Sequence, residues 1–247
     1  MGMHRMPKFF LSGDDSGFET NNEITITGPD ANHIRGALRH KKGDALEVSR
    51  RGLDFLCEIT GVTEAGVTLK IISRAEDNRE PLVRVTMFIA ALKGASMDYA
   101  VQKCVELGAH EIVPVLSERC VVRPADKSNK AGRYQRIAES AAKQSLRGIV
   151  PRVTDHMKLN EALTYSAGLD INIFAHEKEK TNGIKKTANG KTTAGIFIGP
   201  EGGFTDAETR EMEGRGLLPV SLGRRVMRAE TAAAAALIIF LYESGEY

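Results

Sequence analysis

The segment IGPEGGF, residues 198–204, follows directly on the apolar run AGIFI of residues 194–198. It holds three glycines and one proline within seven residues. Glycine serves where the backbone needs a positive φ or a close approach, and proline rigidifies the chain and removes an N–H donor. These seven residues alone are therefore compatible with a tight turn or with a loop that cradles a ligand.

The chain around this segment alternates strand-like and helix-like stretches from residue 82 onward. Strands are predicted at residues 82–92, 112–116, 171–174, 194–198 and 219–222. Helices are predicted at residues 97–105, about 128–146, from 206 onward and at 230–242. Strands separated by helices predict an α/β fold with a mainly parallel sheet covered on both faces. In such sheets ligands bind just beyond the carboxyl ends of the strands, where residues 198–204 lie.

The helix that follows the glycine segment has its own start signal. Thr205 and Glu208 form a capping box, so this helix begins without help from the glycines. The cap leaves Gly199, Gly202 and Gly203 unexplained, which favours a ligand cradle over a simple turn. The spacing matches neither G-x-G-x-x-G nor G-x-x-x-x-G-K-S/T, and this disfavours dinucleotides and nucleoside triphosphates.

A second glycine loop, SLGRRVMRAET at residues 221–231, follows the last predicted strand. It offers a turn at Gly223, the arginines Arg224, Arg225 and Arg228, and a Glu-Thr pair that opens the terminal helix. A helix N-terminus presents free backbone N–H groups. Two such loops side by side would enclose a small ligand with backbone contacts and leave arginine to face a charged substrate.

The first part of the chain has a different pattern. Residues 23–27, 45–48, 55–60 and 67–72 alternate with period two between glycine-containing turns, which predicts a small antiparallel barrel. One helix is predicted at residues 30–39, and the polar residues 73–81 read as a linker. We expect two domains, at residues 1–75 and 76–247.

Composition narrows the class of protein. The 247 residues are 42% hydrophobic, enough for a real core. No window approaches the roughly 18 apolar residues of a spanning helix, and the first residues lack the apolar region of a secretory signal, so a cytoplasmic protein is expected. Cys57, Cys104 and Cys120 are far apart and form no C-x-x-C pair, which indicates reduced thiols and no metal site.

The charge is unevenly distributed although the net charge is only +2. Residues 119–152 hold nine lysines and arginines against two acids, and residues 35–51 hold a second basic cluster. Such patches in a near-neutral protein suggest a polyanion held at defined places. A solvated helix face remains the alternative for either patch alone.

Six motifs follow one another along the chain: Lys93-Gly94 with Met97-Asp98, Lys103-x-x-Glu106-Leu-Gly108, Pro114-x-x-Ser117-Glu-Arg119, Gln144-Ser145-x-Arg147, Ile198-Gly-Pro-Glu-Gly-Gly203 and Leu222-Gly-x-Arg-Val-Met-Arg-Ala-Glu-Thr231. In this order they resemble the bacterial 16S ribosomal RNA uridine-N3 methyltransferases, the small-subunit methyltransferase E family of the knotted SPOUT class. The amino-terminal residues His33-Ile34, Leu38-Arg39 and Gly43-Asp44 are similar to that family's PUA-like barrel. The resemblance covers nearly the whole chain.

The resemblance implies a deep trefoil knot in the carboxyl-terminal domain, an RNA-binding PUA-like barrel, and a homodimer with the knot helices at its interface. It implies S-adenosylmethionine as the cofactor and 16S ribosomal RNA of the small subunit as the partner, without membrane or metal. The cofactor residues would be Ala175, His176, Ile198, Gly199, Pro200, Glu201, Gly202, Gly203, Ser221, Leu222, Gly223, Val226, Met227 and Thr231. The basic patches would supply the RNA contacts Arg35, Arg39, Lys41, Arg119, Arg123, Lys127, Arg133, Arg136, Arg147 and Arg225.

For the chemistry, Arg228 is the first candidate to stabilise the uracil oxygens, because a guanidinium is always charged and presents several donors. Glu230 is a candidate base or orienting group, although an ion pair between Arg228 and Glu230 would equally brace the knot. His176 is either a general base or a hydrogen-bonded structural residue, and Glu201 either caps N–H groups or positions the ligand.

Departures from the family pattern leave further alternatives. The commoner Arg-Thr-Glu-Thr is Arg228-Ala-Glu-Thr231 here, and an acidic position before Gln144 is Lys143. The chain could methylate another atom, such as a ribose 2′-hydroxyl, or another RNA. It could also be an RNA-binding assembly factor with a relic pocket, although the intact glycine loop speaks against this.

Overall fold

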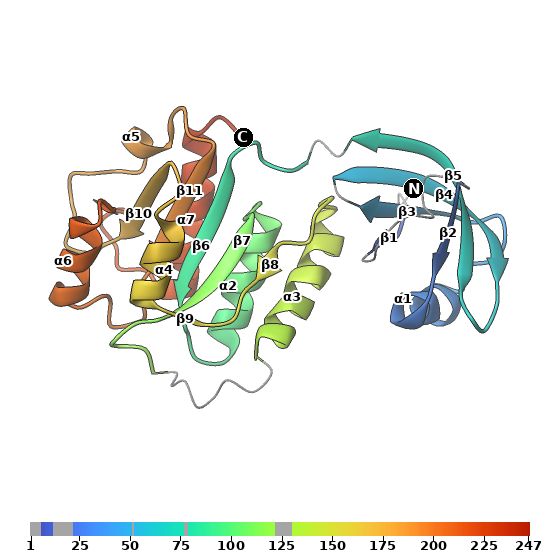
Figure 1. Ribbon diagram of the computed structural model, residues 1–247, viewed down its shortest axis with the longest axis horizontal. Coiled ribbons are helices and arrows are strands. Elements are labelled where there is room, and N and C mark those ends of the chain that lie inside the picture. The colour runs from blue at the N-terminus through green and yellow to red at the C-terminus, as the bar shows by residue number, and fades with distance from the viewer. Residues whose placement is uncertain (1–5, 12–21, 51, 77–78, 122–129) are drawn as a thin grey trace. The chain divides into compact units, whose positions relative to one another are not determined.

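Two compact units make up the chain (Figure 1). The computed structural model describes residues 6–11, 22–50, 52–76, 79–121 and 130–247. The first unit comprises Met1–Glu80 together with Ser145–Val150, and the second comprises Pro81–Gln144 and Pro151–Tyr247. Residues 145–150 thus belong to the first unit although they lie between two segments of the second, and nothing in the sequence pattern predicts this.

The second unit is built on a sheet in which every strand pairs in parallel, as the alternating pattern predicts. Its strand order is β12-β10-β11-β6-β7-β8, with β9 also pairing β7. The strands are β6 (Arg84–Ala90), β7 (Glu111–Leu116), β8 (Arg152–Val153), β9 (Met157–Lys158), β10 (Ile171–Ala175), β11 (Thr193–Ile198) and β12 (Leu218–Val220). β11 therefore lies between β10 and β6, buried as its apolar run predicts.

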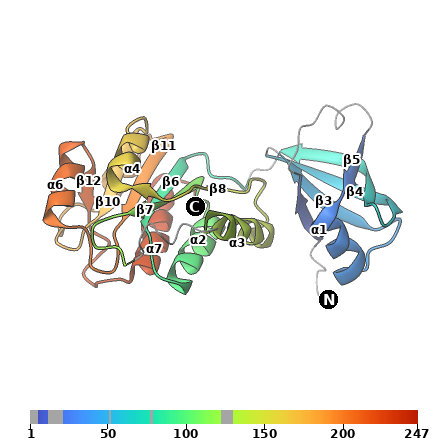
Figure 2. The same ribbon diagram turned by 60° about the horizontal axis from the view of Figure 1, so that its bottom comes forward.

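Helices cover both faces of this sheet, so the predicted α/β class is confirmed. α4 and α6 lie on one face, and α2, α3 and α7 on the other (Figure 2). The helices are α2 (Ala95–Glu106), α3 (Lys130–Ser145), α4 (Leu159–Ser166), α5 (Lys185–Ala188), α6 (Asp206–Gly214) and α7 (Ala229–Glu243). Phe88 and Phe197 stack at 4.2 Å between ring centroids in the core beneath α4 and α6. The packing of this apolar layer holds the ends of the strands in place, and the functional site described below lies at these ends.

The elements between residues 151 and 190 have no counterpart in the sequence prediction except β10. β8 and β9 are two residues long, too short for any alternation to be visible. α4 starts after Lys158, which is not a common N-cap residue, and α5 spans only four residues. Short elements of this kind are defined by their partners in the sheet rather than by their own sequence.

The first unit contains a five-stranded sheet in the order β1-β3-β4-β5-β2. The strands are β1 (Lys8–Phe10), β2 (Glu23–Ile26), β3 (Ala45–Arg50), β4 (Leu53–Val62) and β5 (Val67–Glu76). The four predicted strands are present, and β2 to β5 pair antiparallel as predicted. The all-antiparallel expectation is wrong for β1, which pairs in parallel with β3.

The helix predicted at residues 30–39 is present as one continuous helical segment over residues 28–37, with an α-helical and a π-helical turn. α1 (Gly28–Asn32) begins with Pro29 in its first turn, where a missing N–H costs nothing. A π-helical turn, η1 (His33–Ala37), follows it directly. The segment ends before Arg39, whose φ of 56° is incompatible with a continued right-handed helix.

Charged side chains hold residues 145–150 within the first unit. Lys8 pairs with Glu47 and Asp54 and donates to the carbonyl oxygen of Leu146 at 3.0 Å. Burial opposes ionisation of Asp54, but its hydrogen bonds from Lys8 and Ser49 outweigh that effect and hold its pKa below the usual value. The carboxylate of Asp54 therefore remains ionised at neutral pH.

Arg147 belongs to this buried region, which corrects the RNA contact expected for it. Its side chain is 5% exposed and binds Glu80 in a fork, with Nε–Oε1 at 3.1 Å and Nη2–Oε2 at 2.5 Å. Glu80 also accepts hydrogen bonds from the N–H groups of Gly148 and Ile149. A guanidinium bound in this way is not available to an RNA phosphate, so Arg147 has a structural role.

The three cysteines are free, as predicted. Burial raises the pKa of the Cys57 and Cys104 thiols to about 12, so both are unreactive near neutral pH. Among the described residues, no helix combines the length and the apolar character needed to cross a bilayer.

Candidate functional site

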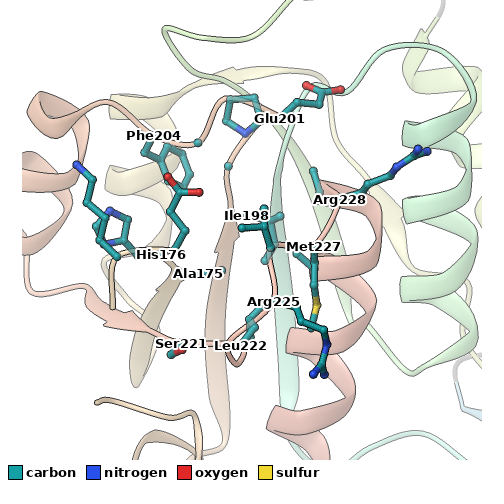
Figure 3. Close-up of a pocket in the computed structure, with 18 of the residues that line it drawn as sticks. Ala175, His176, Ile198, Glu201, Phe204, Ser221, Leu222, Arg225, Met227 and Arg228 are labelled. Carbon is teal, nitrogen blue, oxygen red and sulfur yellow. The ribbon is translucent and has the colours of Figure 1, made fainter. Parts of the chain in front are cut away.

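A cavity of about 410 Å³ opens at the carboxyl ends of β10, β11 and β12. Three segments that follow these strands form its wall, with His176 and Phe204 on one side and Met227 and Arg228 on the other (Figure 3). From the predicted cofactor set, the cavity is lined by Ala175, His176, Ile198, Gly199, Pro200, Glu201, Gly203, Ser221, Leu222, Gly223, Val226 and Met227. The two glycine loops of the sequence thus lie together at one site.

Gly203 and Gly199 each have a structural reason, whereas a side chain at Gly202 would meet only an ordinary contact. Gly203 has a φ of +67°, the left-handed region that disfavours side chains. A Cβ at Gly199 would lie 3.3 Å from both the ring and the backbone nitrogen of Phe204, and one at Gly202 would lie 3.4 Å from Cδ of Arg119. The loop is therefore shaped by close approaches as well as by a turn.

The segment closes on itself before α6 begins. The N–H of Gly203 donates to the carbonyl oxygen of Pro200 at 2.8 Å. The predicted capping box is present, because Thr205 Oγ1 accepts from the N–H of Glu208 and Glu208 accepts from the N–H of Thr205. Phe204 is buried at the cavity wall and packs edge-on against Phe174. The loop is a preformed turn between a buried strand and a capped helix.

The wall formed after β12 is supported by residues 179–183. The N–H of Ser221 donates to the carbonyl oxygen of Asn182 at 2.8 Å, and Gly183 forms a bridge with Ser221. The N–H of Asn182 and the hydroxyl and N–H of Thr181 bind the Glu179 carboxylate and lower its pKa to about 2. Glu179 stays ionised down to about that pH and keeps this support in place.

Arg225 and Arg228 both lie at the cavity wall with exposed side chains (Figure 3). Arg228 is the N-cap residue of α7 but makes no side-chain capping hydrogen bond. Its guanidinium is therefore not needed to start the helix. Where the chain is described, no ion pair joins Arg228 to Glu230, so the bracing pair considered from the sequence does not form.

Three predicted site residues do not reach the cavity wall. Gly202 faces Arg119, and Thr231 is exposed within the first turn of α7. Glu230, half-buried in the same turn, favours the amino end of the helix electrostatically. Each residue along a helix turns the side chain by about 100°, so Glu230 and Thr231 point away from the cavity that Ala229 and Ala232 line.

The sequence reading did not assign several residues that line the cavity. These are Glu177, Lys178, Phe204, Asp206, Ala229 and Ala232. Lys178 and Asp206 form an ion pair at 2.8 Å, and the Lys178 ammonium lowers the pKa of Asp206. Both are strongly exposed, so the pair adds little stability. Lys178 follows the end of β10 and Asp206 begins α6, and these positions in the sequence could have predicted that both residues lie at the cavity.

The basic residues expected to contact RNA differ in their availability. Arg39, Lys41 and Arg136 are exposed, and Arg119 and Arg225 lie at the cavity. Arg35 binds the carbonyl oxygen of Thr63 and the side chain of Asn32, and Arg133 pairs with Asp98. Arg123 and Lys127 lie outside the described residues. Nowhere in the described ranges do three metal-ligating side chains gather.

The cavity suits an organic ligand of moderate size. Its volume lies within the roughly 300–1,000 Å³ usual for small-molecule sites. Ile198, Leu222 and Met227 supply apolar contacts, and the glycine backbone allows close approach of polar ligand groups. Arginines at one side would face an anionic or electron-rich acceptor.

Comparison with known proteins shows the family to which the whole chain is similar. Residues 78–241 match the model of the RNA methyltransferase domain family. Ribosomal RNA small subunit methyltransferase E of Bacillus subtilis (strain 168) is 30% identical over 97% of both chains. The enzyme of that name from Mesomycoplasma hyopneumoniae (strain 232) is 30% identical over 92% of this chain and 96% of its own.

A solved structure extends the comparison. Ribosomal RNA small subunit methyltransferase E from Neisseria gonorrhoeae, bound to S-adenosyl methionine, superposes with a TM-score of 0.85 at 27% identity. The match covers 97% of this chain and 98% of that one.

Proposed function

This chain belongs to the ribosomal RNA small subunit methyltransferase E family, and we propose that it methylates N3 of one uridine in the 16S RNA. The methylation of ribosomal RNA follows from the family. The choice of uracil N3 is our proposal. It rests on the resemblance to the uridine-N3 methyltransferases, and the exposed arginines beside the cavity are suited to stabilise an N3 anion. The single observation that carries it is this cavity, formed by the ends of three adjacent parallel strands and bordered by Arg225 and Arg228.

S-adenosylmethionine is the cofactor, and the described residues fit it. The adenosine and methionine parts need apolar surface and backbone hydrogen bonds, which the two glycine loops offer. We propose that the segment after β10, the 198–203 loop and residues 221–227 hold it. When bound, the cofactor supplies an electrophilic methyl group on a positively charged sulfur.

The protein's part in the reaction is to hold uracil N3 in line and to favour its anionic form. Neutral uracil carries a proton at N3, which in this proposal passes to solvent water, and its loss leaves negative charge shared with the exocyclic oxygens O2 and O4. We propose that Arg228 binds these oxygens, since a guanidinium aimed at developing charge stabilises it without reorganisation. Arg225, on the same wall, would contact the phosphate of the target nucleotide.

Glu230 has no proton-transfer step in this proposal. It does not line the cavity, and its place in the first turn of α7 gives it an electrostatic role in the helix. His176 lines the cavity, and its N–H donates to the carbonyl oxygen of Val220 while its ring packs against Phe174. We assign His176 to shaping the cofactor wall.

We further propose that the first unit is a PUA-like barrel that binds RNA. Its exposed Arg39 and Lys41 support this, together with the exposed Arg136 of α3 in the second unit. Reversing Arg39 and Arg136 together to glutamate should weaken binding to small ribosomal subunits about tenfold and flatten its salt dependence. Filter binding at two salt concentrations measures both, and unchanged affinity would exclude these contacts.

α7 supports a homodimer. Its residues Ala232, Ala233, Ala236, Leu237, Phe240 and Leu241 are buried within the unit. Ala235, Ile238, Ile239 and Tyr242 recur at helical spacing on another stripe that is half-buried or exposed. We propose that two copies cover this stripe. A mass in solution near twice 26.9 kDa is expected by light scattering, and a mass of one chain would contradict it.

The trefoil knot is also part of the proposal. β12 lies at the sheet edge beside β10, yet α7 returns to contact β6 and β11 near the middle of the sheet. Such a return, with Asn182 and Gly183 lying against Ser221, is compatible with a threaded chain. A deep knot is the exception among folds, and crystallographic tracing of residues 171–247 tests it directly.

The activity is tested by incubation with S-adenosylmethionine labelled in its methyl group and small ribosomal subunits from cells that lack the enzyme. Nucleoside analysis should find the label in N3-methyluridine. Label in a 2′-O-methylated nucleoside would instead identify a methyltransferase with another target atom. Binding of subunits without any transfer would identify an RNA-binding assembly factor.

A further inference from the structure

The turn at residues 117–120, directly after β7, contacts the backbone of the glycine loop. Nη1 of Arg119 donates a hydrogen bond of 2.7 Å to the carbonyl oxygen of Gly202. The stem of the same side chain lies beside Gly202, where a Cβ would make an ordinary van der Waals contact of 3.4 Å with Cδ of Arg119. Arg119 also lines the cavity. Its guanidinium is thus bound to the loop itself.

A second set of hydrogen bonds joins this turn to the start of α6. The N–H of Glu118 donates to Oε1 of Glu208 at 2.8 Å, while Oε2 of Glu208 accepts from the N–H of Thr205 at 2.8 Å. The Thr205 hydroxyl donates to Oε2 of Glu118 at 3.3 Å. One carboxylate therefore holds the turn and the helix start together.

The glycine loop is held from outside at two points, Gly202 and Thr205. Gly203, between these two points, has a left-handed backbone conformation that glycine adopts readily. A loop rich in glycine has many alternative conformations. Because only the binding-competent fraction of a protein contributes to affinity, contacts that hold the loop raise that affinity.

We propose that Arg119 is a positioning residue for the cofactor, one that holds the 198–203 loop in the conformation that receives S-adenosylmethionine. This role is distinct from the RNA contact expected for Arg119 from the sequence, since its side chain is exposed and this hydrogen bond uses only Nη1. The inference rests on the proposed function, because it requires that this loop bind the cofactor.

Calorimetric titration with S-adenosylhomocysteine, without RNA, tests this. Arg119→Ala should weaken binding about tenfold, the loss expected for one hydrogen bond from a charged donor. Arg119→Lys should recover most of the affinity, since an ammonium can donate to the same carbonyl oxygen. Arg215→Ala is the matched control, because Arg215 is a partly exposed arginine that pairs with Glu211 away from the cavity. It should bind as the unaltered protein does.

Three other outcomes would contradict the role of Arg119 or the proposed function, and each can be distinguished from the others. Unchanged affinity for S-adenosylhomocysteine in Arg119→Ala, with weaker binding of small ribosomal subunits, would overturn the inference in favour of an RNA contact. Equal losses in Arg119→Ala and Arg119→Lys would overturn it as well, since lysine retains a donor. If the unaltered protein bound no S-adenosylhomocysteine, the proposed function itself would fail.

Discussion

Replacement of Arg228 by alanine is expected to slow methyl transfer about a hundredfold while leaving cofactor affinity within about twofold. Removal of one preorganised donor to a developing negative charge typically costs that much in rate. Arg228 is exposed at the cavity wall and makes no capping hydrogen bond, so its loss should not disturb the fold of α7. Single-turnover transfer from labelled S-adenosylmethionine to small subunits measures the rate, and calorimetry measures the affinity.

Two further variants separate charge from position. Arg228→Lys retains the charge but presents a single point donor, so an intermediate rate is expected. Arg224→Ala removes a neighbouring exposed arginine that does not line the cavity, and its rate should be unchanged. A full rate in Arg228→Ala, or an equal fall in Arg224→Ala, would show that acceptor chemistry does not depend on Arg228.

Replacement of Gly203 by valine is expected to weaken cofactor binding by about tenfold or more. Gly203 has a φ of +67°, and a β-branched residue in that region costs more than the roughly 1–2 kcal/mol of an ordinary side chain. The loop would relieve the strain by leaving its binding conformation. Gly203→Asn should lose less, because asparagine tolerates this region better. Titration with S-adenosylhomocysteine ranks the three proteins.

Gly216 provides the matched control for backbone strain. It has a φ of +85° in the turn that ends α6 and does not line the cavity. Gly216→Val should lower the melting temperature without changing cofactor affinity. Equal affinity losses at both glycines would mean that global destabilisation, rather than the shape of the loop, explains the effect.

The strand, the capped helix and the two glycine loops that form the site could be predicted from the sequence. The buried run before Gly199 and the capping box at Thr205 and Glu208 each depend on local pattern, and both are found as predicted. The two glycine loops meet because parallel strands end at the same edge of a sheet. Local periodicity and the topology rule together placed the cavity.

Side-chain partners could not be predicted in the same way. Arg147 is an arginine in a basic segment, which in the sequence suggests contact with RNA. In the structure it forms a buried ion pair with Glu80, which is remote in sequence. Arg119 is bound to Gly202 across a similar distance along the chain. Such contacts depend on tertiary packing, and a count of charges along the chain carries no information about them.

A crystal structure of the protein with S-adenosylhomocysteine tests the central claim most directly. We expect the ligand within the cavity at the ends of β10, β11 and β12, in contact with the backbone of residues 198–203 and 221–227. Arg228 should remain at the rim, outside the cofactor and open to an acceptor base. A ligand bound on any other surface, with this cavity unfilled, would contradict the account.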